Sequence, residues 1–284
     1  LAKINFKTGG NRTIRTTWAD LIQDLNKHED FGKYIKKSKK LASKVLNIDE
    51  ILTTTPKERF NTVLDYVKNN YKWNNFIGKY TTKSPSKFVK EKHGSCAEIN
   101  LFTIGLLNAV GIEAYPVLSS TRSNGKIKYD YPYSHFFNYV LILAKVDGKT
   151  ILSDATDTFN SNQRIPLRCI NEKGLVIEKD KENWVSLKSN FLSQEQSTFV
   201  VETSAQNTKT GVVVYATEYN ALSYRKFYGD DSQRIQTDLN KKNYNVSQEN
   251  IGIKNPRNSK KPYYYAYKTS SKTENINGKL YLSP

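Results

Sequence analysis

The sequence predicts an α+β protein in which a buried central helix packs on an antiparallel sheet and a β-rich C-terminal domain follows. Three observations predict this class. Residues 94–111 are apolar almost all round a helical period, which is typical of a helix in the centre of a domain. Residues 114–118, 137–144 and 150–153 then have the composition of strands. From residue 196 the chain is rich in tyrosine and β-prone residues, separated by polar turns.

The composition excludes several classes of protein. The 284 residues suffice for one large or two ordinary domains. Hydrophobic residues make up 37%, but 12% of the chain is aromatic and the apolar residues come in periodic blocks, so most of the chain is not disordered. No stretch approaches the ~20 apolar residues of a membrane helix. Two cysteines cannot form a disulfide scaffold, and the absence of methionine indicates a fragment or a processed product.

The net charge of +17 is unevenly distributed. Residues 1–95 carry 20 basic and 9 acidic groups, residues 96–195 carry 11 of each, and residues 196–284 carry the remaining excess. The densest basic run suits one solvated helix face or a loop and consists of Lys33, Lys36, Lys37, Lys39, Lys40 and Lys44. No nucleic-acid module accompanies this run, so we expect no specific nucleic-acid partner. Weak attraction to anionic surfaces stays open.

Two helices are predicted before the central one. The first follows Thr16 and Thr17, which can cap it, and its apolar face consists of Trp18, Leu21, Ile22 and Leu25. The second begins with a capping box at residues 55–58, with proline at the first helical position, and should end near residues 69–70. Its apolar face consists of Phe60, Val63, Leu64 and Val67. Residues 71–93 are expected to be irregular.

These elements divide the chain into three predicted parts. Residues 1–15 are interpreted as the remnant of a preceding β domain, with a break at Gly9 and Gly10. Residues 16–195 should form the core, and residues 196–284 the β-rich C-terminal domain. Gly111 is the expected cap at the C-terminal end of the central helix.

Three residues in this core have the chemistry of an activated nucleophile. Cys96 lies where a glycine-containing loop enters the buried helix, and backbone N–H groups at a helix N-terminus lower the pKa of a thiol. His135 precedes a predicted strand and Asp154 ends the next one. A cysteine, then a base, then a carboxylate that orients the base is the order required for nucleophilic catalysis. Each residue alone is more typical of a structural role, so only the ordered combination is informative.

The turn predicted at Asp147 and Gly148 bears on this triad. A two-residue hairpin turn there pairs Val146 with Lys149, which leaves His135 six residues beyond the position opposite Asp154, or about 20 Å at ~3.3 Å per residue. A bulge or a wider loop would have to close that gap. We follow the motif here, since turn placement from sequence is error-prone.

At these residues the sequence resembles the transglutaminase-like superfamily, whose core is papain-like. The Gly-x-Cys pattern at the head of a central helix is matched by Gly94 and Cys96. Three later patterns of the family are also matched. Gly111 and Ile112 match its Gly-Ile turn, and Asp154 and Thr156 match its Asp-x-Thr. Its His-x-aromatic-Asn-x-Val strand is matched by His135, Phe137, Asn138 and Val140. The resemblance is good over residues 55–160 and softer around residues 18–21 and 167–171. It points to a bacterial group with flanking β domains that is commonly exported to the envelope, in the periplasm or outside the cell.

The resemblance implies cysteine-dependent acyl transfer or amide hydrolysis on a peptide or protein substrate, as in a protease, amidase or transglutaminase. Cys96 would attack an amide carbonyl and form a thioester, His135 would transfer the proton, and Asp154 would orient the imidazole. The Cys96 backbone N–H would supply part of an oxyanion hole. The candidates for its second donor are Trp73 and Asn74, although a core role for Trp73 is an equal alternative.

Two further expectations complete the sequence-based interpretation. His93 lies in a polar loop and should be exposed, and no His, Cys or Asp cluster has metal-ligand spacing, so we expect no metal and no cofactor. The alternative to an enzyme is a non-catalytic transglutaminase-like module that binds a peptide or a glycan in the bacterial envelope. A reactive Cys96 separates these two readings. The oligomeric state is not indicated.

Overall fold

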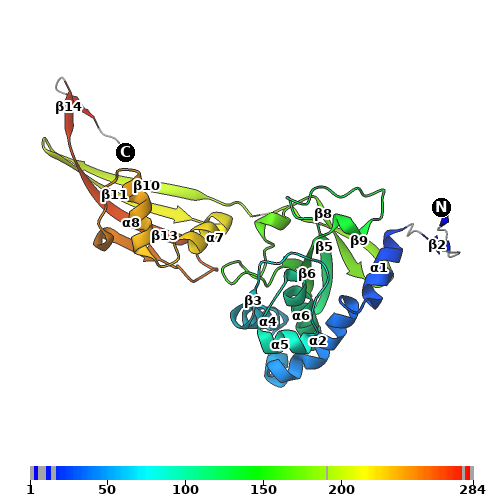
Figure 1. Cartoon of the computed structure of the whole chain (residues 1–284). Helices are drawn as coiled ribbons and strands as arrows, with labels where there is room; N and C mark the ends of the chain where they lie inside the picture. The colour runs from blue at the N-terminus through cyan, green and yellow to red at the C-terminus, as the bar shows by residue number, and fades with distance from the viewer. Residues whose placement is uncertain (1–2, 6–10, 14–16, 190, 277–278, 282–284) are drawn as a thin grey trace. The chain divides into compact units, whose positions relative to one another are not determined.

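The computed structural model describes residues 3–5, 11–13, 17–189, 191–276 and 279–281. The chain divides into two compact units, Leu1–Ser189 and Asn190–Pro284, close to the boundary predicted at residues 195 and 196 (Figure 1). Near the N-terminus, β1 (Lys3–Asn5) pairs with β2 (Asn11–Thr13). The predicted break at Gly9 and Gly10 lies outside the described residues.

The helical part of the first unit surrounds one central helix. The helices are α1 (Trp18–Lys27), α2 (Gly32–Val45), α3 (Ile48–Leu52), α4 (Pro56–Asn70), α5 (Pro85–Glu91) and α6 (Cys96–Ala109). As predicted, α6 is the buried one: every residue from Cys96 to Leu107 is buried. Its apolar side chains lie between the helical layer and the sheet. They belong to one core cluster that contains buried residues of α1 and α4 and also Val140 and Ile142 of the sheet. Cys96, the first residue of α6, belongs to a second buried cluster with Val117, Tyr139 and Leu141.

A five-stranded antiparallel sheet forms the other layer of this unit (Figure 1). In spatial order its strands are β7 (Lys149–Ser153), β6 (Tyr139–Val146), β5 (Glu113–Ser119), β8 (Lys173–Glu178) and β9 (Lys181–Ser186). The first three confirm the predicted strands, whereas β8 and β9 were not predicted. The expected turn is also present: Val146 pairs with Lys149, and Asp147 and Gly148 both have positive φ, as a two-residue hairpin turn requires.

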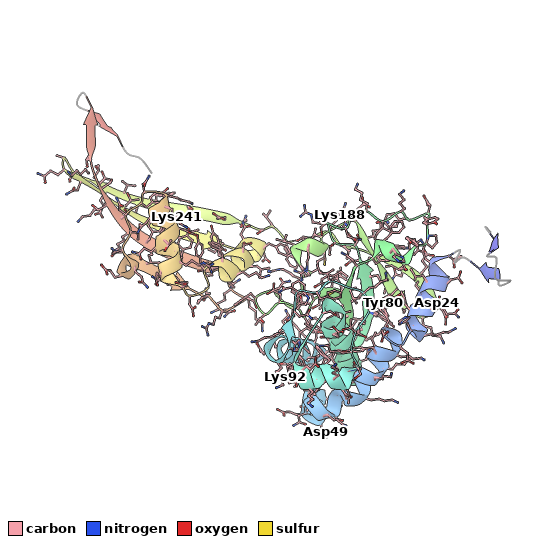
Figure 2. All side chains as sticks on the ribbon, in the orientation of Figure 1. Asp24, Asp49, Tyr80, Lys92, Lys188 and Lys241 are labelled. Carbon is pink, nitrogen blue, oxygen red and sulfur yellow. The ribbon has the colours of Figure 1, made fainter. Side chains whose placement is uncertain are left out.

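Residues 71–93 differ from the expectation of an irregular segment. They contain α5 and two short parallel strands, β3 (Lys72–Trp73) and β4 (His93–Gly94). Ser84 caps α5 by accepting from the backbone N–H of Lys87, and Pro85 holds its first position. Lys92, labelled in Figure 2, ends the helix in the left-handed conformation with φ 56°. This segment joins α4 to the start of α6.

The capping box predicted before α4 is present. Thr55 accepts from the backbone N–H of Glu58, and the Glu58 carboxylate accepts from the backbone N–H of Thr55 at 2.9 Å. We expect Thr55→Ala to lower the free energy of unfolding by about 1 kcal/mol, because one helix N–H loses its acceptor. Urea denaturation followed by tryptophan fluorescence measures this, since all three tryptophans lie in the first unit. A variant as stable as the parent would contradict a functional cap.

The second unit contains a four-stranded antiparallel sheet and two helices. The strands, in spatial order, are β10 (Glu195–Thr203), β11 (Asn207–Ala216), β13 (Tyr263–Lys272) and β12 (Ile251–Lys254). The helices are α7 (Glu218–Phe227) and α8 (Ser232–Lys241), which the sequence reading did not predict. Residues of α8 pack with the sheet in a tyrosine-rich core. β14 (Glu274–Ile276) pairs with β15 (Lys279–Tyr281) in a separate antiparallel pair. Among the described residues, no helix has the length and apolar character needed to cross a membrane.

Candidate functional site

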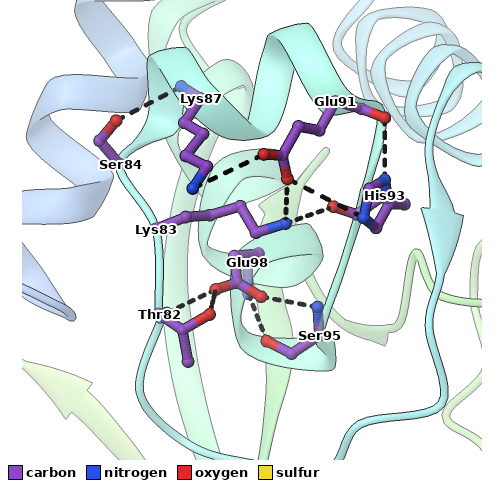
Figure 3. Close-up of polar contacts among 8 residues, drawn as sticks. All are labelled: Thr82, Lys83, Ser84, Lys87, Glu91, His93, Ser95 and Glu98. Carbon is purple, nitrogen blue, oxygen red and sulfur yellow. Dashed lines mark hydrogen bonds and ion pairs between the residues drawn. The ribbon is translucent and has the colours of Figure 1, made fainter.

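A buried capping box positions Cys96 at the first turn of α6 (Figure 3). Ser95 accepts from the backbone N–H of Glu98, and the Glu98 carboxylate accepts from the backbone N–H groups of Ser95 at 2.6 Å and Thr82 at 2.5 Å. Burial opposes ionisation of Glu98, but these hydrogen bonds hold its pKa below the usual value. The carboxylate thus ties the segment before α5 to the N-terminus of the central helix.

The Cys96 thiol is buried and hydrogen-bonded to the backbone of its own chain. Its Sγ donates to the carbonyl of Gly78 at 3.2 Å and lies 3.5 Å from the Gly78 N–H. Burial raises the pKa of the Cys96 thiol to about 12, although the Gly78 hydrogen bond lowers it. This is opposite to the direction expected at a helix N-terminus, because removal of the charged form from water outweighs the local hydrogen bond. The resting form of Cys96 is therefore the thiol.

Two of the predicted oxyanion-hole donors converge on one oxygen. The backbone N–H of Cys96 donates to the carbonyl of Phe76 at 3.2 Å, and Nε1–H of Trp73 donates to the same carbonyl at 3.0 Å. Asn74, the other candidate, instead accepts from the backbone N–H of Phe76 at 2.9 Å through its side chain. The N–H groups of Cys96 and Trp73 are thus arranged like the donors of an oxyanion hole, and the Phe76 carbonyl of this chain occupies the position between them.

Asp154 is the centre of a buried hydrogen-bond network. The side chain is fully buried, and its carboxylate accepts from the hydroxyl of Tyr139 at 2.8 Å and from the side-chain amide of Asn100 at 2.8 Å. The other oxygen accepts from the backbone N–H of Thr156 at 2.9 Å and from its hydroxyl. Asn100 lies one helical turn after Cys96, so the network joins α6 to the end of β7.

Arg168 extends the network to Trp73. It donates to the Tyr139 hydroxyl at 2.8 Å and to the Thr156 hydroxyl at 3.2 Å. Its guanidinium group also lies over the Trp73 ring, 4.2 Å from the centroid. Tyr139 thus accepts a hydrogen bond from Arg168 and donates one to Asp154; burial and the Asp154 charge keep it a neutral phenol, although Arg168 lowers its pKa. Burial raises the pKa of Tyr139 well above its ordinary value.

The structure does not bring His135 to the other two members of the predicted triad. His135 is exposed, lies in the short 3-10 helix Ser134–Phe136, and stacks on Tyr133 with ring centroids 4.6 Å apart. Among the described residues, no hydrogen bond joins it to Cys96 or to Asp154. The Cys96–His135–Asp154 triad stays a prediction, and the placement of its members argues against it.

The hairpin register explains this placement. Ile142 pairs with Ser153, so the position opposite Asp154 is Leu141, and no bulge closes the distance to His135. Tyr139 lies two residues beyond Leu141 on the same face of β6 and therefore reaches Asp154. The sequence reasoning missed Tyr139, Asn100 and the role of Arg168. The register at Asp147 and Gly148 was the signal that could have found Tyr139.

In the parts of the chain that the structure describes, no group of three or more His, Cys, Asp or Glu side chains could hold a metal ion. His93 is exposed, as expected. Its Nδ1 lies 3.0 Å from the carbonyl oxygen of Glu91, and its Nε2 lies 3.9 Å from the Glu91 carboxylate (Figure 3). The second cysteine, Cys169, is buried in the same core cluster as Cys96 and Tyr139.

A match to a family model supports the fold of the first unit. Residues 48–150 match the family model of the transglutaminase-like superfamily. A solved structure from Parabacteroides distasonis, proposed to be a protease, is 13% identical with a TM-score of 0.45, over 90% of this chain and 52% of that one. One from Cytophaga hutchinsonii, proposed to be a cysteine protease, is 16% identical with a TM-score of 0.31, over 56% of this chain and 53% of that one. A search of the curated proteins finds no match.

A third solved structure, named a TGase, is 15% identical with a TM-score of 0.29, over 52% of this chain and 34% of that one. The chain thus spans about half of the length of the first two structures and about a third of the last. The matched segment contains α6 and two complete strands of the five-stranded sheet, β5 and β6, of which β6 carries Tyr139. Residues 48–150 are thus similar to the transglutaminase-like superfamily, and antiparallel sheets follow them toward the C-terminus.

Proposed function

We propose that the transglutaminase-like core of this chain is a non-catalytic module that binds a peptide beside a chemically silent centre. The observation that carries the proposal is the hydrogen bond from the Tyr139 hydroxyl to Asp154. The carboxylate that would orient an imidazole holds a phenol instead. A phenol whose pKa lies well above 10 cannot serve as the general base near neutral pH.

The surroundings of Cys96 support the same proposal. A thiol with a pKa of about 12 has almost no thiolate at neutral pH, and the thiolate is the nucleophile. The oxyanion-hole donors are already paired with the carbonyl of Phe76. A substrate carbonyl would have to displace this contact and the Gly78 contact to the thiol. Binding beside the centre requires neither change.

The rate of Cys96 alkylation by iodoacetamide, measured against pH, tests the proposal. Peptide mapping by mass spectrometry separates the Cys96 adduct from that of Cys169, so no cysteine needs to be replaced. We expect slow modification that shows no titration below pH 9 and does not change in a His135→Ala variant. The protein in concentrated urea is the control, and there both thiols should titrate near ~8.5.

The opposite result would favour the enzyme. Fast alkylation that titrates well below ~8.5 and is lost in His135→Ala means a working thiolate–imidazolium pair. In that case the segment 120–138 must deliver His135 to Cys96, and the acyl transfer or amide hydrolysis implied by the sequence resemblance becomes the function to assay on peptide substrates.

A further inference from the structure

A pocket of about 360 Å³ lies next to the Asp154 network in the first unit. Two residues connect it to the centre: Trp73, whose ring lies under Arg168, and Thr156, which donates to Asp154. The full lining consists of Lys68, Asn69, Tyr71, Lys72, Trp73, Thr156 and Thr158. Two of these side chains are cationic and none is acidic. The volume is at the lower end of the range for ligand pockets.

Lys68 is an unusual residue for this position. Its side chain extends from α4, only 6% of the residue is exposed, and its Nζ donates to the carbonyl of Asn160 at 2.8 Å. A lysine ammonium has three N–H donors, and this carbonyl is its only hydrogen-bond acceptor among the described residues. Asp65, Asp154 and Asp157 act on Lys68 by charge, without a hydrogen bond. A buried ammonium group whose N–H donors are not all hydrogen-bonded lowers the stability of the fold. A role in binding a ligand would account for a lysine at this position.

We propose that this pocket binds the carboxylate of a peptide, with Lys68 and Lys72 as its cationic partners and the Trp73 ring against the neighbouring peptide group. The inference rests on the proposed function, since it names the ligand chemistry of that module. The three nearby aspartates limit the positive potential, which favours a singly charged carboxylate over a doubly charged phosphate. The half-buried Trp73 supplies an apolar surface for the adjoining residue.

The pH dependence of Lys68 gives the proposal a signature. Burial lowers the pKa of Lys68 to about 8. Between pH 8 and the ordinary lysine value of ~10.4, the unfolded chain therefore binds more protons, and the stability of the native chain rises with pH over this window. Below pH 8 the folded chain retains a buried charge. Carboxylate affinity should fall as pH rises above 8, because Lys68 loses that charge.

The experiment follows the indole N–H signal of Trp73 by NMR during titration of the whole chain, with the signal assigned from a Trp73→Phe variant. The probes are N-acetyl-trialanine as the free acid, its C-terminal amide, an amidated N-acetyl-Ala-Glu-Ala, and inorganic phosphate. We expect the free acid to shift this signal saturably and the trialanine amide to leave it unchanged. If the glutamate peptide also binds, the pocket accepts a side-chain carboxylate. If it does not bind, the pocket is specific for the carboxylate of a peptide C-terminus.

Two variants and a matched control make the test specific. Lys68→Met and Lys72→Met should each weaken binding of the acid at least tenfold, whereas Lys90→Met removes an exposed lysine outside the pocket and should not. Lys68→Met should also unfold at higher urea concentration than the parent at pH 7, an advantage that disappears toward pH 10.5. Lys72 is exposed, so its variant tests the pocket even if Lys68→Met fails to fold.

Several outcomes would overturn the inference. These are equal binding of acid and amide, tighter binding of phosphate than of either peptide, unchanged affinity in both pocket variants, and no saturable shift with any probe. The alkylation of Cys96 is independent of these titrations. If Cys96 is unreactive and the free acid does not bind, the carboxylate pocket is refuted but the non-catalytic module is not. If Cys96 is reactive, the non-catalytic module is refuted, and the titrations still decide on the pocket.

Discussion

Asp154→Ala should lower the free energy of unfolding of the first unit by about 3 to 5 kcal/mol, the range for breaking a buried charged network by removing one partner. The hydroxyl of Tyr139 and both donors of Thr156 would lose their Asp154 acceptor in a buried setting, and the Asn100 amide would keep only the Val140 carbonyl. Arg168, which donates to Tyr139 and Thr156, would then lack a nearby negative partner. Urea denaturation followed by tryptophan fluorescence measures the loss.

Two companion variants make this result interpretable. Asp130→Ala removes an exposed carboxylate and should change the stability by no more than about 0.5 kcal/mol. Asp154→Asn keeps the shape of the side chain and one acceptor oxygen, so its loss should be intermediate. If Asp154→Ala cost less than about 1 kcal/mol, the carboxylate would not hold the core together, and a role limited to catalysis would regain support.

Gly105→Ala should lower the free energy of unfolding by about 3 kcal/mol, the upper end of the usual range for overpacking a core. A Cβ at Gly105 would lie 2.5 Å from the Cβ of Ser38, 2.8 Å from the carbonyl oxygen of Ile35 and 2.9 Å from the backbone nitrogen of Lys39. Two of these atoms belong to the backbone of α2, so a side-chain rotation cannot relieve the clash. The helix α2 would have to move away from α6.

The sign of this effect is itself decisive. In an open helix position, Gly→Ala stabilises by about 1 kcal/mol through helix propensity. A gain in stability for Gly105→Ala would thus contradict the close contact between α2 and α6. The double variant Gly105→Ala with Ser38→Gly removes one of the three short contacts, and it should recover only part of the loss, as measured by the same urea denaturation.

Local sequence signals predicted the elements that are bounded by a recognisable helix cap or turn. The capping box at residues 55–58 predicted α4 at its observed start, and Asp147 with Gly148 predicted the β6–β7 turn. The helix α5 was missed although Ser84 and Pro85 repeat the signal of Thr55 and Pro56, because seven residues are too few to show an apolar period. The β8–β9 hairpin was also missed, although its two strands are adjacent in the sequence, and so were α7 and α8.

The site was predicted only in part for a related reason. Cys96 and Asp154 end or begin regular elements, so their burial in one core follows from the pattern of helix and strand. His135 lies in a long connection between β5 and β6 that has no periodic signal, and a motif match there cannot fix a position in space. Tyr139 resembled an ordinary strand aromatic. Its role appears only when the register places it beside Asp154.

The burial of both cysteines has a practical consequence for spectroscopy. Cys96 and Cys169 each have no exposed surface, and burial holds the pKa of both thiols above the ordinary value. A single cysteine introduced at an exposed position is therefore the only site that a maleimide dye or spin label should modify quickly in the folded chain. Distances within either unit can then be followed by paired labels without first removing the native thiols.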